Sequence, residues 1–148
     1  MTKRMLKVAR KAMEKAYAPY SKYHVGVCAE AEDGMLFPGC NVENASYGIT
    51  ICAEVNAITS LIAAGKKRIK SLLVMGSGGE LCTPCGRCRQ FIREFASLDM
   101  PIHLADKSKV LKTVTLDCLL PMSFGPDHLA KKDMKKTVIK KVKHNKRK

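Results

Sequence analysis

Two short apolar segments separated by a helical pattern constrain the fold of this chain more than any other feature. The run 71–75 is closed by four Gly and Ser residues, and the run 102–105 follows Pro101. Such short apolar runs are typical of strands buried on both faces. Between them, the pattern at 85–96 places apolar side chains on one face of a helix. Strands that alternate with helices predict a three-layer α/β/α sandwich around a central mixed β-sheet.

The remaining elements follow from local patterns. Apolar residues at helical spacing predict an opening helix that ends near Pro19, and Asp33-Gly34 suits a tight hairpin turn. Thr50 stands where a helix N-cap is expected. The further predicted elements are a helix over 2–17, hairpin strands over 23–31 and 35–39, a loop over 41–48, a helix from about 51 to 65 and a last strand over 112–116.

Length and composition predict one globular domain followed by a basic tail. The chain has 148 residues, of which 46% are hydrophobic, and this excludes a disordered chain. Net charge is +14, but residues 130–148 carry ten Lys or Arg and one acid. We therefore expect a folded domain over 1–129 and a C-terminal tail over 130–148 that is either helical or disordered.

The cysteines indicate a reducing compartment. The chain has seven cysteines and no apolar run long enough for a membrane span or a secretory signal. Disulfides rarely persist in the cytosol, so the thiols are expected to be free, catalytic or bound to metal in a cytoplasmic protein.

Three cysteines and one glutamate form the pattern that carries chemistry. Cys85 and Cys88 lie three residues apart at a predicted helix start, and Cys52 precedes Glu54 by two residues at another. Three thiolates with an open fourth position describe a catalytic zinc site, and the carboxylate beside it can move protons. The arrangement is typical of zinc deaminases. A redox pair, a closed structural zinc site and a thiol cluster without metal are the alternatives, and Cys82 is a competing third ligand that would leave Glu54 without a role.

Further segments give the chain a specific resemblance. They include Pro19-Tyr20-Ser21-Lys22-Tyr23, the stretch from Gly39 to Gly48, Cys88-Arg89-Gln90 and the stretch from Leu119 to Pro126. Together with the cysteine motifs, they make residues 5–129 resemble a small cytidine deaminase of the homotetrameric type. The resemblance implies one Zn²⁺ per subunit, bound by Cys52, Cys85 and Cys88, with Glu54 as the catalytic group.

The resemblance also implies a substrate pocket. Asn41 and Glu43 would hold the ribose hydroxyls, and Tyr23 would pack on the pyrimidine. Ala53 would be a further substrate contact, while Tyr47 and Phe124 would reach the site of a neighbouring subunit. Asn and Glu also suit a diol chemically, since they offer donors and acceptors. The alternatives are a solvated loop for Asn41, Glu43 and Tyr47, and core packing for Phe124.

One position departs from the family pattern. Members of this family often carry Arg directly after the catalytic Glu, whereas this chain has Val55. Zinc with three thiolates has a net charge of about −1, which weakens it as a Lewis acid. Arg87, between the two motif cysteines, is expected to supply the missing cation from outside the ligand set, the alternative being an exposed surface Arg.

The sequence thus predicts hydrolytic deamination of cytidine and 2′-deoxycytidine to uridine and 2′-deoxyuridine with release of ammonia, a step of pyrimidine salvage. One alternative is a blasticidin-type deaminase, which acts on a cytosine-containing antibiotic. Another is a nucleic-acid-binding or editing deaminase that uses the basic tail, although this tail contains no aromatic residue. The expected partner is therefore a nucleoside, without a membrane, and the resemblance implies three further copies of the chain in a homotetramer.

Overall fold

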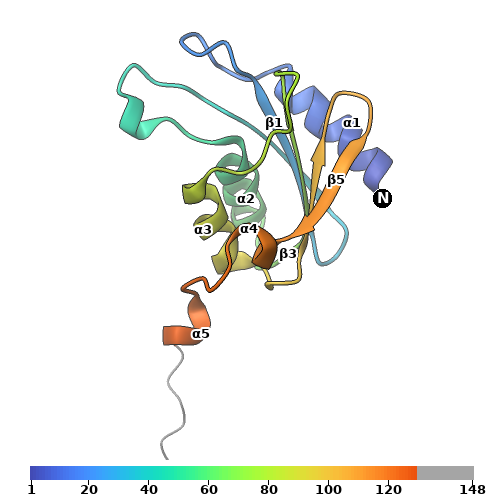
Figure 1. Ribbon diagram of the computed structural model, residues 1–148, viewed down its shortest axis with the longest axis vertical. Helices are drawn as coiled ribbons and strands as arrows, with labels where there is room; N and C mark the ends of the chain where they lie inside the picture. Colours follow the sequence, from blue (N-terminus) through green and yellow to red (C-terminus); the bar gives the residue numbers. More distant parts are fainter. Residues whose placement is uncertain (130–148) are drawn as a thin grey trace, which may run out of the picture.

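A five-stranded sheet forms the centre of the molecule (Figure 1). The computed structural model describes residues 1–129, and the strand order is β2-β1-β3-β4-β5. Only β3 and β4 pair in parallel, while the other three pairs are antiparallel, so the sheet is mixed as predicted. The strands are β1 (Val25–Ala31), β2 (Leu36–Cys40), β3 (Ile69–Gly76), β4 (Pro101–Ala105) and β5 (Val110–Thr115).

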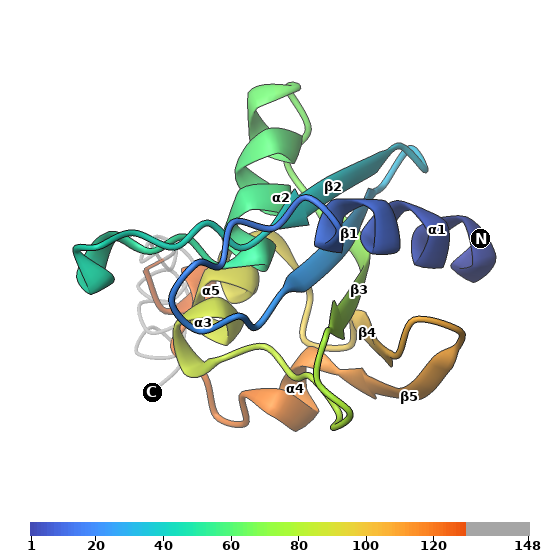
Figure 2. The same cartoon turned by 90° about the horizontal axis from the view of Figure 1, so that it is seen from above.

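Helices cover both faces of this sheet, as Figure 2 shows from above. Alternate residues of one strand point to opposite faces. Leu73 packs in one apolar cluster with residues of α1, and its neighbours Leu72 and Val74 pack in another with residues of α2 and α3. This arrangement confirms the α/β class. The helices are α1 (Thr2–Met13), α2 (Ala53–Ala63), α3 (Gly86–Phe95), α4 (Leu116–Leu119) and α5 (Pro126–Leu129), with a short 3₁₀ helix η1 (Tyr47–Ile49).

Helix α1 is shorter than its apolar pattern predicts. The helix ends at Met13, four residues before the expected end, because the following backbone bonds to a distant loop. The Tyr17 N–H donates to the Asn41 carbonyl at 3.0 Å, and the Tyr17 carbonyl accepts from the Glu43 N–H at 2.8 Å. These bonds fasten the end of the α1 segment to the loop that follows β2.

The predicted hairpin between β1 and β2 is present, with Asp33-Gly34 in its turn. Within this turn, only Gly34 has a positive φ, at 84°. The Gly34 N–H donates to the Ala31 carbonyl, and the Ala31 N–H donates to the Met35 carbonyl, each at 2.9 Å. This is a three-residue loop that closes with a glycine bulge, a common alternative to the tight primed turns.

The start of α2 and the end of β5 also differ from the boundaries that the sequence predicts. Cys52, not Thr50, is the N-cap residue of α2, and the Thr50 hydroxyl accepts a hydrogen bond from the Asn44 N–H at 3.2 Å instead. The last strand ends at Thr115, because Leu116 begins α4 and is fully buried.

The basic tail predicted over 130–148 lies outside the described residues. Within residues 1–129, the helices are too short or too polar to cross a membrane.

Candidate metal centre and surrounding pocket

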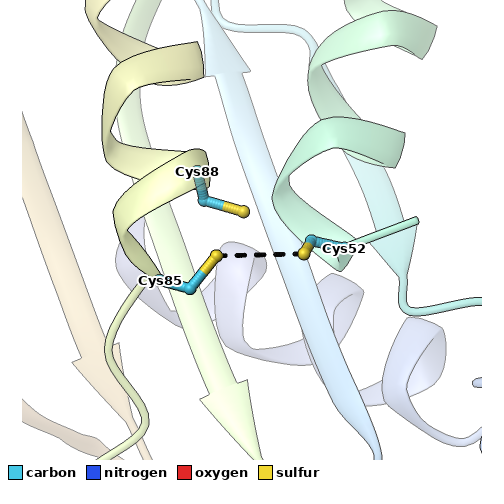
Figure 3. A group of neighbouring side chains, drawn as sticks. All are labelled: Cys52, Cys85 and Cys88. Carbon is cyan, nitrogen blue, oxygen red and sulfur yellow. Dashed lines mark hydrogen bonds between the residues drawn. The ribbon is translucent and has the colours of Figure 1, made fainter. Parts of the chain in front are cut away.

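Three thiols meet where the N-termini of α2 and α3 converge (Figure 3). Cys52 is the N-cap residue of α2, Cys85 is the N-cap residue of α3, and Cys88 lies in the first turn of α3. Their sulfur atoms all lie within 4.8 Å of one another, and the Sγ atoms of Cys52 and Cys85 are 4.0 Å apart. Helix N-termini carry partial positive charge and favour thiolates. The structure therefore brings together the three cysteines that the sequence predicts as ligands.

The chemistry of this donor set fits a divalent cation. Four ligands around zinc at about 2.3 Å would place sulfurs about 3.8 Å apart, close to the observed spacing. Hydrogen bonding from Cys88, and to a lesser degree from Cys85, lowers the pKa of Cys52 to about 6. The same hydrogen bond and burial raise the pKa of Cys88. Three thiolates this close together repel one another, so a bound cation would stabilise them.

Cys82 lies outside the thiol cluster. Its side chain lies beside Tyr23 instead. Burial, followed by the proximity of Cys82, raises the pKa of Tyr23 to about 12. The Tyr23 hydroxyl also lies against Gly76, where an added Cβ would approach it to 2.3 Å. The geometry therefore favours Cys52 over Cys82 as the third thiol of the cluster, and makes Cys82 part of the wall beside Tyr23.

Glu54 lies beside the thiol cluster, in the first turn of α2. The residue is 5% exposed, and burial raises the pKa of its carboxyl, although its own backbone N–H and the Cys88 thiol act in the opposite direction. A carboxyl that is shielded from water and next to a metal site suits proton transfer.

The expected ribose ligands, Asn41 and Glu43, also organise the backbone. The Asn41 side chain accepts from the Val25 N–H at 2.8 Å and donates to the Tyr23 carbonyl at 2.9 Å. The Glu43 carboxylate accepts from the backbone N–H of Tyr20, and from the N–H and hydroxyl of Ser21. Each side chain retains bonding capacity: one amide hydrogen and one lone pair on Asn41, and about one lone pair on Glu43.

Glu43 opens onto a hollow of about 480 Å³, lined by Tyr20, Ser21, Glu43, Tyr47 and Thr50. The Tyr20 and Tyr47 rings meet edge to face with centroids 6.0 Å apart. The sequence assigned no role to Tyr20 and Ser21, although both lie in a segment that carries the family resemblance. The hollow therefore combines a carboxylate and a hydroxyl with aromatic walls.

Arg87 lies between this hollow and the thiols. Its Nη1 donates to the Thr50 carbonyl at 3.5 Å, and its positive charge contributes to the lowered pKa of Cys52. The side chain is exposed. Val55, where the family often has Arg, is buried. These contacts place a cation near the cluster, on the solvent side.

The other two predicted contacts, Ala53 and Phe124, differ in their surroundings. Ala53 is buried next to Gly39 at the start of α2. Phe124 is absent from the residues that line the hollow; its ring is 58% exposed and stacks on His128 at 5.0 Å. Within a single subunit, Phe124 therefore does not join the pocket that Glu43 and Tyr47 line.

Comparisons with known proteins agree with this geometry. Residues 1–104 match the family described as the cytidine and deoxycytidylate deaminase zinc-binding region. Cytidine deaminase of Sporosarcina psychrophila is 38% identical over 127 residues, which are 86% of this chain and 93% of that protein. Cytidine deaminase of Mycobacterium tuberculosis is 39% identical over 121 residues, covering 82% and 87% of the two chains.

Solved structures give the same result for the fold. The crystal structure of cytidine deaminase from Burkholderia pseudomallei aligns with a TM-score of 0.79 at 37% identity, covering 84% of this chain and 99% of that one. The enzyme from Mycobacterium tuberculosis aligns with a TM-score of 0.73 at 36% identity, covering 83% and 96%. The family match, these identities and the three-thiol cluster together show that the chain belongs to the zinc-binding cytidine and deoxycytidylate deaminase family.

Proposed function

We propose that the protein is a zinc-dependent cytidine deaminase, which hydrolyses cytidine and 2′-deoxycytidine to uridine and 2′-deoxyuridine and releases ammonia. The observation that carries this proposal is the buried carboxylate of Glu54 beside the thiols of Cys52, Cys85 and Cys88. The family relationship and the high coverage of its cytidine deaminase relatives support the substrate. The reaction belongs to pyrimidine salvage.

Cys52, Cys85 and Cys88 would hold the zinc ion, and Glu54 would move the protons. When bound, zinc supplies a Lewis acid that lowers the pKa of a coordinated water. Glu54 takes a proton from the attacking water, delivers it to N3 of the pyrimidine and carries a second proton to the departing amine. The water oxygen replaces the amino group at C4, so water and cytidine are converted into uridine and ammonia.

The substrate would be held by groups that already have a fixed position. Asn41 and Glu43 are fixed by the backbone of residues 20–25, and their remaining donor and acceptor positions suit ribose hydroxyls. The Tyr23 ring and the backbone at Ala53 would contact the pyrimidine.

A homotetramer with shared sites would complete the pocket. Phe124 does not line the hollow of its own subunit, and Tyr47 is 76% exposed although it lines that hollow. We infer that both rings contact the site of a neighbouring subunit. We further propose a cytoplasmic location, because a three-thiol metal site requires reduced cysteines.

Metal content and turnover of the purified protein test the proposal together. We expect one zinc per chain and a loss of cytidine absorbance on mixing, whereas blasticidin and single-stranded oligonucleotides should be poor substrates. Cys52→Ala should lose zinc, while Cys82→Ala, its matched control, should retain it. Turnover of blasticidin or of an oligonucleotide in preference to cytidine would replace the proposed substrate. Retention of zinc in Cys52→Ala with its loss in Cys82→Ala would transfer the ligand role to Cys82.

A further inference from the structure

Helix α3 binds the C-terminal segment of the domain as well as carrying two thiols of the cluster. Three of its side chains donate hydrogen bonds to residues 119–127, which we call the strap. Arg89 donates to the Leu119 carbonyl at 2.8 Å, Gln90 to the Phe124 carbonyl at 3.0 Å, and Arg93 to the Ser123 hydroxyl at 3.1 Å.

Arg93 makes the most enclosed of these contacts. Its side chain is 10% exposed, and besides Ser123 it forms an ion pair with the Asp127 carboxylate. The backbone of the strap lies directly against its guanidinium group: a Cβ added to Gly125 would come within 2.4 Å of Arg93 Cζ. Arg93 therefore contacts the strap on both sides of Phe124, through Ser123 before it and through Gly125 and Asp127 after it.

The Phe124 side chain lies between these contacts of Arg93 and is exposed to solvent. The Phe124 carbonyl is held by Gln90, and the ring stacks on His128, which in turn bonds to Gly125. The ring nevertheless remains 58% exposed. A large apolar side chain with a fixed backbone and an exposed face is suited to contact another molecule, because little conformational entropy is lost when it binds.

We propose that Arg93 is a positioning residue for the substrate site, which acts by holding Phe124 in the orientation that reaches a neighbouring subunit. This inference rests on the proposed function, in which Phe124 contacts the nucleoside of a second copy. Arg93 itself touches neither the thiols nor the expected nucleoside contacts. Its role is to tie the strap to the same helix that carries Cys85 and Cys88.

Steady-state kinetics of Arg93→Gln test this role. Loss of a charged hydrogen-bond network should raise KM for cytidine by about tenfold, with zinc content and kcat close to those of the wild type. Glu94→Gln, an exposed neighbour on α3, is the matched control and should change neither constant. An unchanged KM in Arg93→Gln, or a fall in kcat with loss of zinc, would overturn the proposal.

Gly125→Ala tests the same contact by changing the strap instead of Arg93. The added methyl group displaces the guanidinium and leaves its charge, so we expect the same rise in KM. If Arg93 acts through the strap, the double variant should be no worse than the more affected single variant, because both changes break one contact. Fully additive effects would contradict this.

A spectroscopic measurement separates this inference from the proposed function. The chain contains no tryptophan, so Phe124→Trp introduces a single tryptophan, whose fluorescence can be excited apart from that of the four tyrosines. Arg93→Gln in that background should increase acrylamide quenching, and Glu94→Gln should leave it unchanged. If the wild type fails to convert cytidine, the proposed function fails while this reporter still tests the anchoring. If cytidine is converted and quenching is unchanged by Arg93→Gln, the positioning role is wrong.

Discussion

At the scale of single residues, Glu54 is one of two buried acids among residues 1–129, the other being Glu30 in β1. The pKa of the Glu54 carboxyl is raised by desolvation, whereas Asp33, Asp106 and Asp127, which are not buried, have pKa values lowered mainly by hydrogen bonds. A raised pKa brings a carboxyl toward the neutral range, where it exchanges protons efficiently with a substrate. The burial of Glu54 thus suits its carboxyl to the proton transfer proposed for it.

Glu54→Gln should leave the metal site intact and abolish most of the activity. The amide keeps the shape of the side chain but cannot accept a proton, so we expect kcat to fall by at least about 10². Zinc analysis should still give one ion per chain. Glu14→Gln, at the exposed C-cap residue of α1, controls for the loss of one acid. Near-normal turnover in Glu54→Gln would rule out the assigned proton path.

Arg87 and Val55 form a second test at this scale. The Arg87 charge helps to lower the pKa of Cys52, so Arg87→Ala should reduce kcat/KM, by up to about fivefold for an exposed cation. Zinc should remain bound. Adding Val55→Arg to that variant should recover part of the rate, because two cations that act on one cluster are coupled.

The matched control is Arg68→Ala, an exposed arginine before β3, which should have no effect on kcat/KM. Wild-type kinetics in Arg87→Ala, together with no effect of Val55→Arg in either background, would show that Arg87 is only a surface residue.

At the scale of elements, close packing of α2 on β2 places the first turn of that helix. Gly39 in β2 lies against the helix so closely that an added Cβ would come within 2.3 Å of the Ala53 carbonyl and 2.5 Å of the Ala57 N–H. Both contacts are with backbone, which cannot rotate away. The position of Cys52 and Glu54 therefore depends on a glycine in the neighbouring strand.

Gly39→Ala should destabilise the domain by about 1–3 kcal/mol, the usual cost of overpacking, because α2 must shift away from the sheet. Urea unfolding followed by circular dichroism measures this change. Gly79→Ala is the control, since a Cβ at that position meets nothing within 4 Å. Equal unfolding midpoints for the two variants would contradict the packing argument. A shift of α2 would also be expected to weaken zinc binding.

At the scale of the whole molecule, most of the excess positive charge lies in a different part of the chain from the proposed site. Residues 130–148 contribute ten of the 27 basic residues and one of the 13 acids. The proposed site lies entirely within residues 1–129. The excess positive charge is therefore expected to govern weak, salt-dependent contacts with polyanions rather than catalysis.

Deletion of residues 130–148 should lower retention on a heparin column and leave zinc content and cytidine turnover unchanged. A large loss of turnover would show that this segment belongs to the working enzyme.

Light scattering of both the full chain and the truncated chain should report a tetramer, because Phe124 and Tyr47 are expected to need a neighbouring subunit. A fully active monomer at assay concentration would contradict the shared site.

Sequence by itself determined the classes of the elements and the residue types of the site. Apolar periodicity specified the buried strands and the helices between them, and the spacing of Cys85 and Cys88 placed two thiols on one helix turn. These are local patterns, so they are visible without the fold. The ends of the elements were harder to predict from the sequence. Helix α1, for example, ends at Met13, because the backbone that follows it bonds through Tyr17 to a loop more than twenty residues away.

Only the tertiary structure decided which distant groups meet. The sequence offers both Cys52 and Cys82 as the third thiol beside Cys85 and Cys88. Packing of α2 beside α3 brings Cys52 to that pair of cysteines and leaves Cys82 against Tyr23. The strap contacts of Arg93 depend on the same packing. Contacts of this kind join residues about 30 positions apart, and their geometry follows from how whole elements pack, which no local pattern encodes.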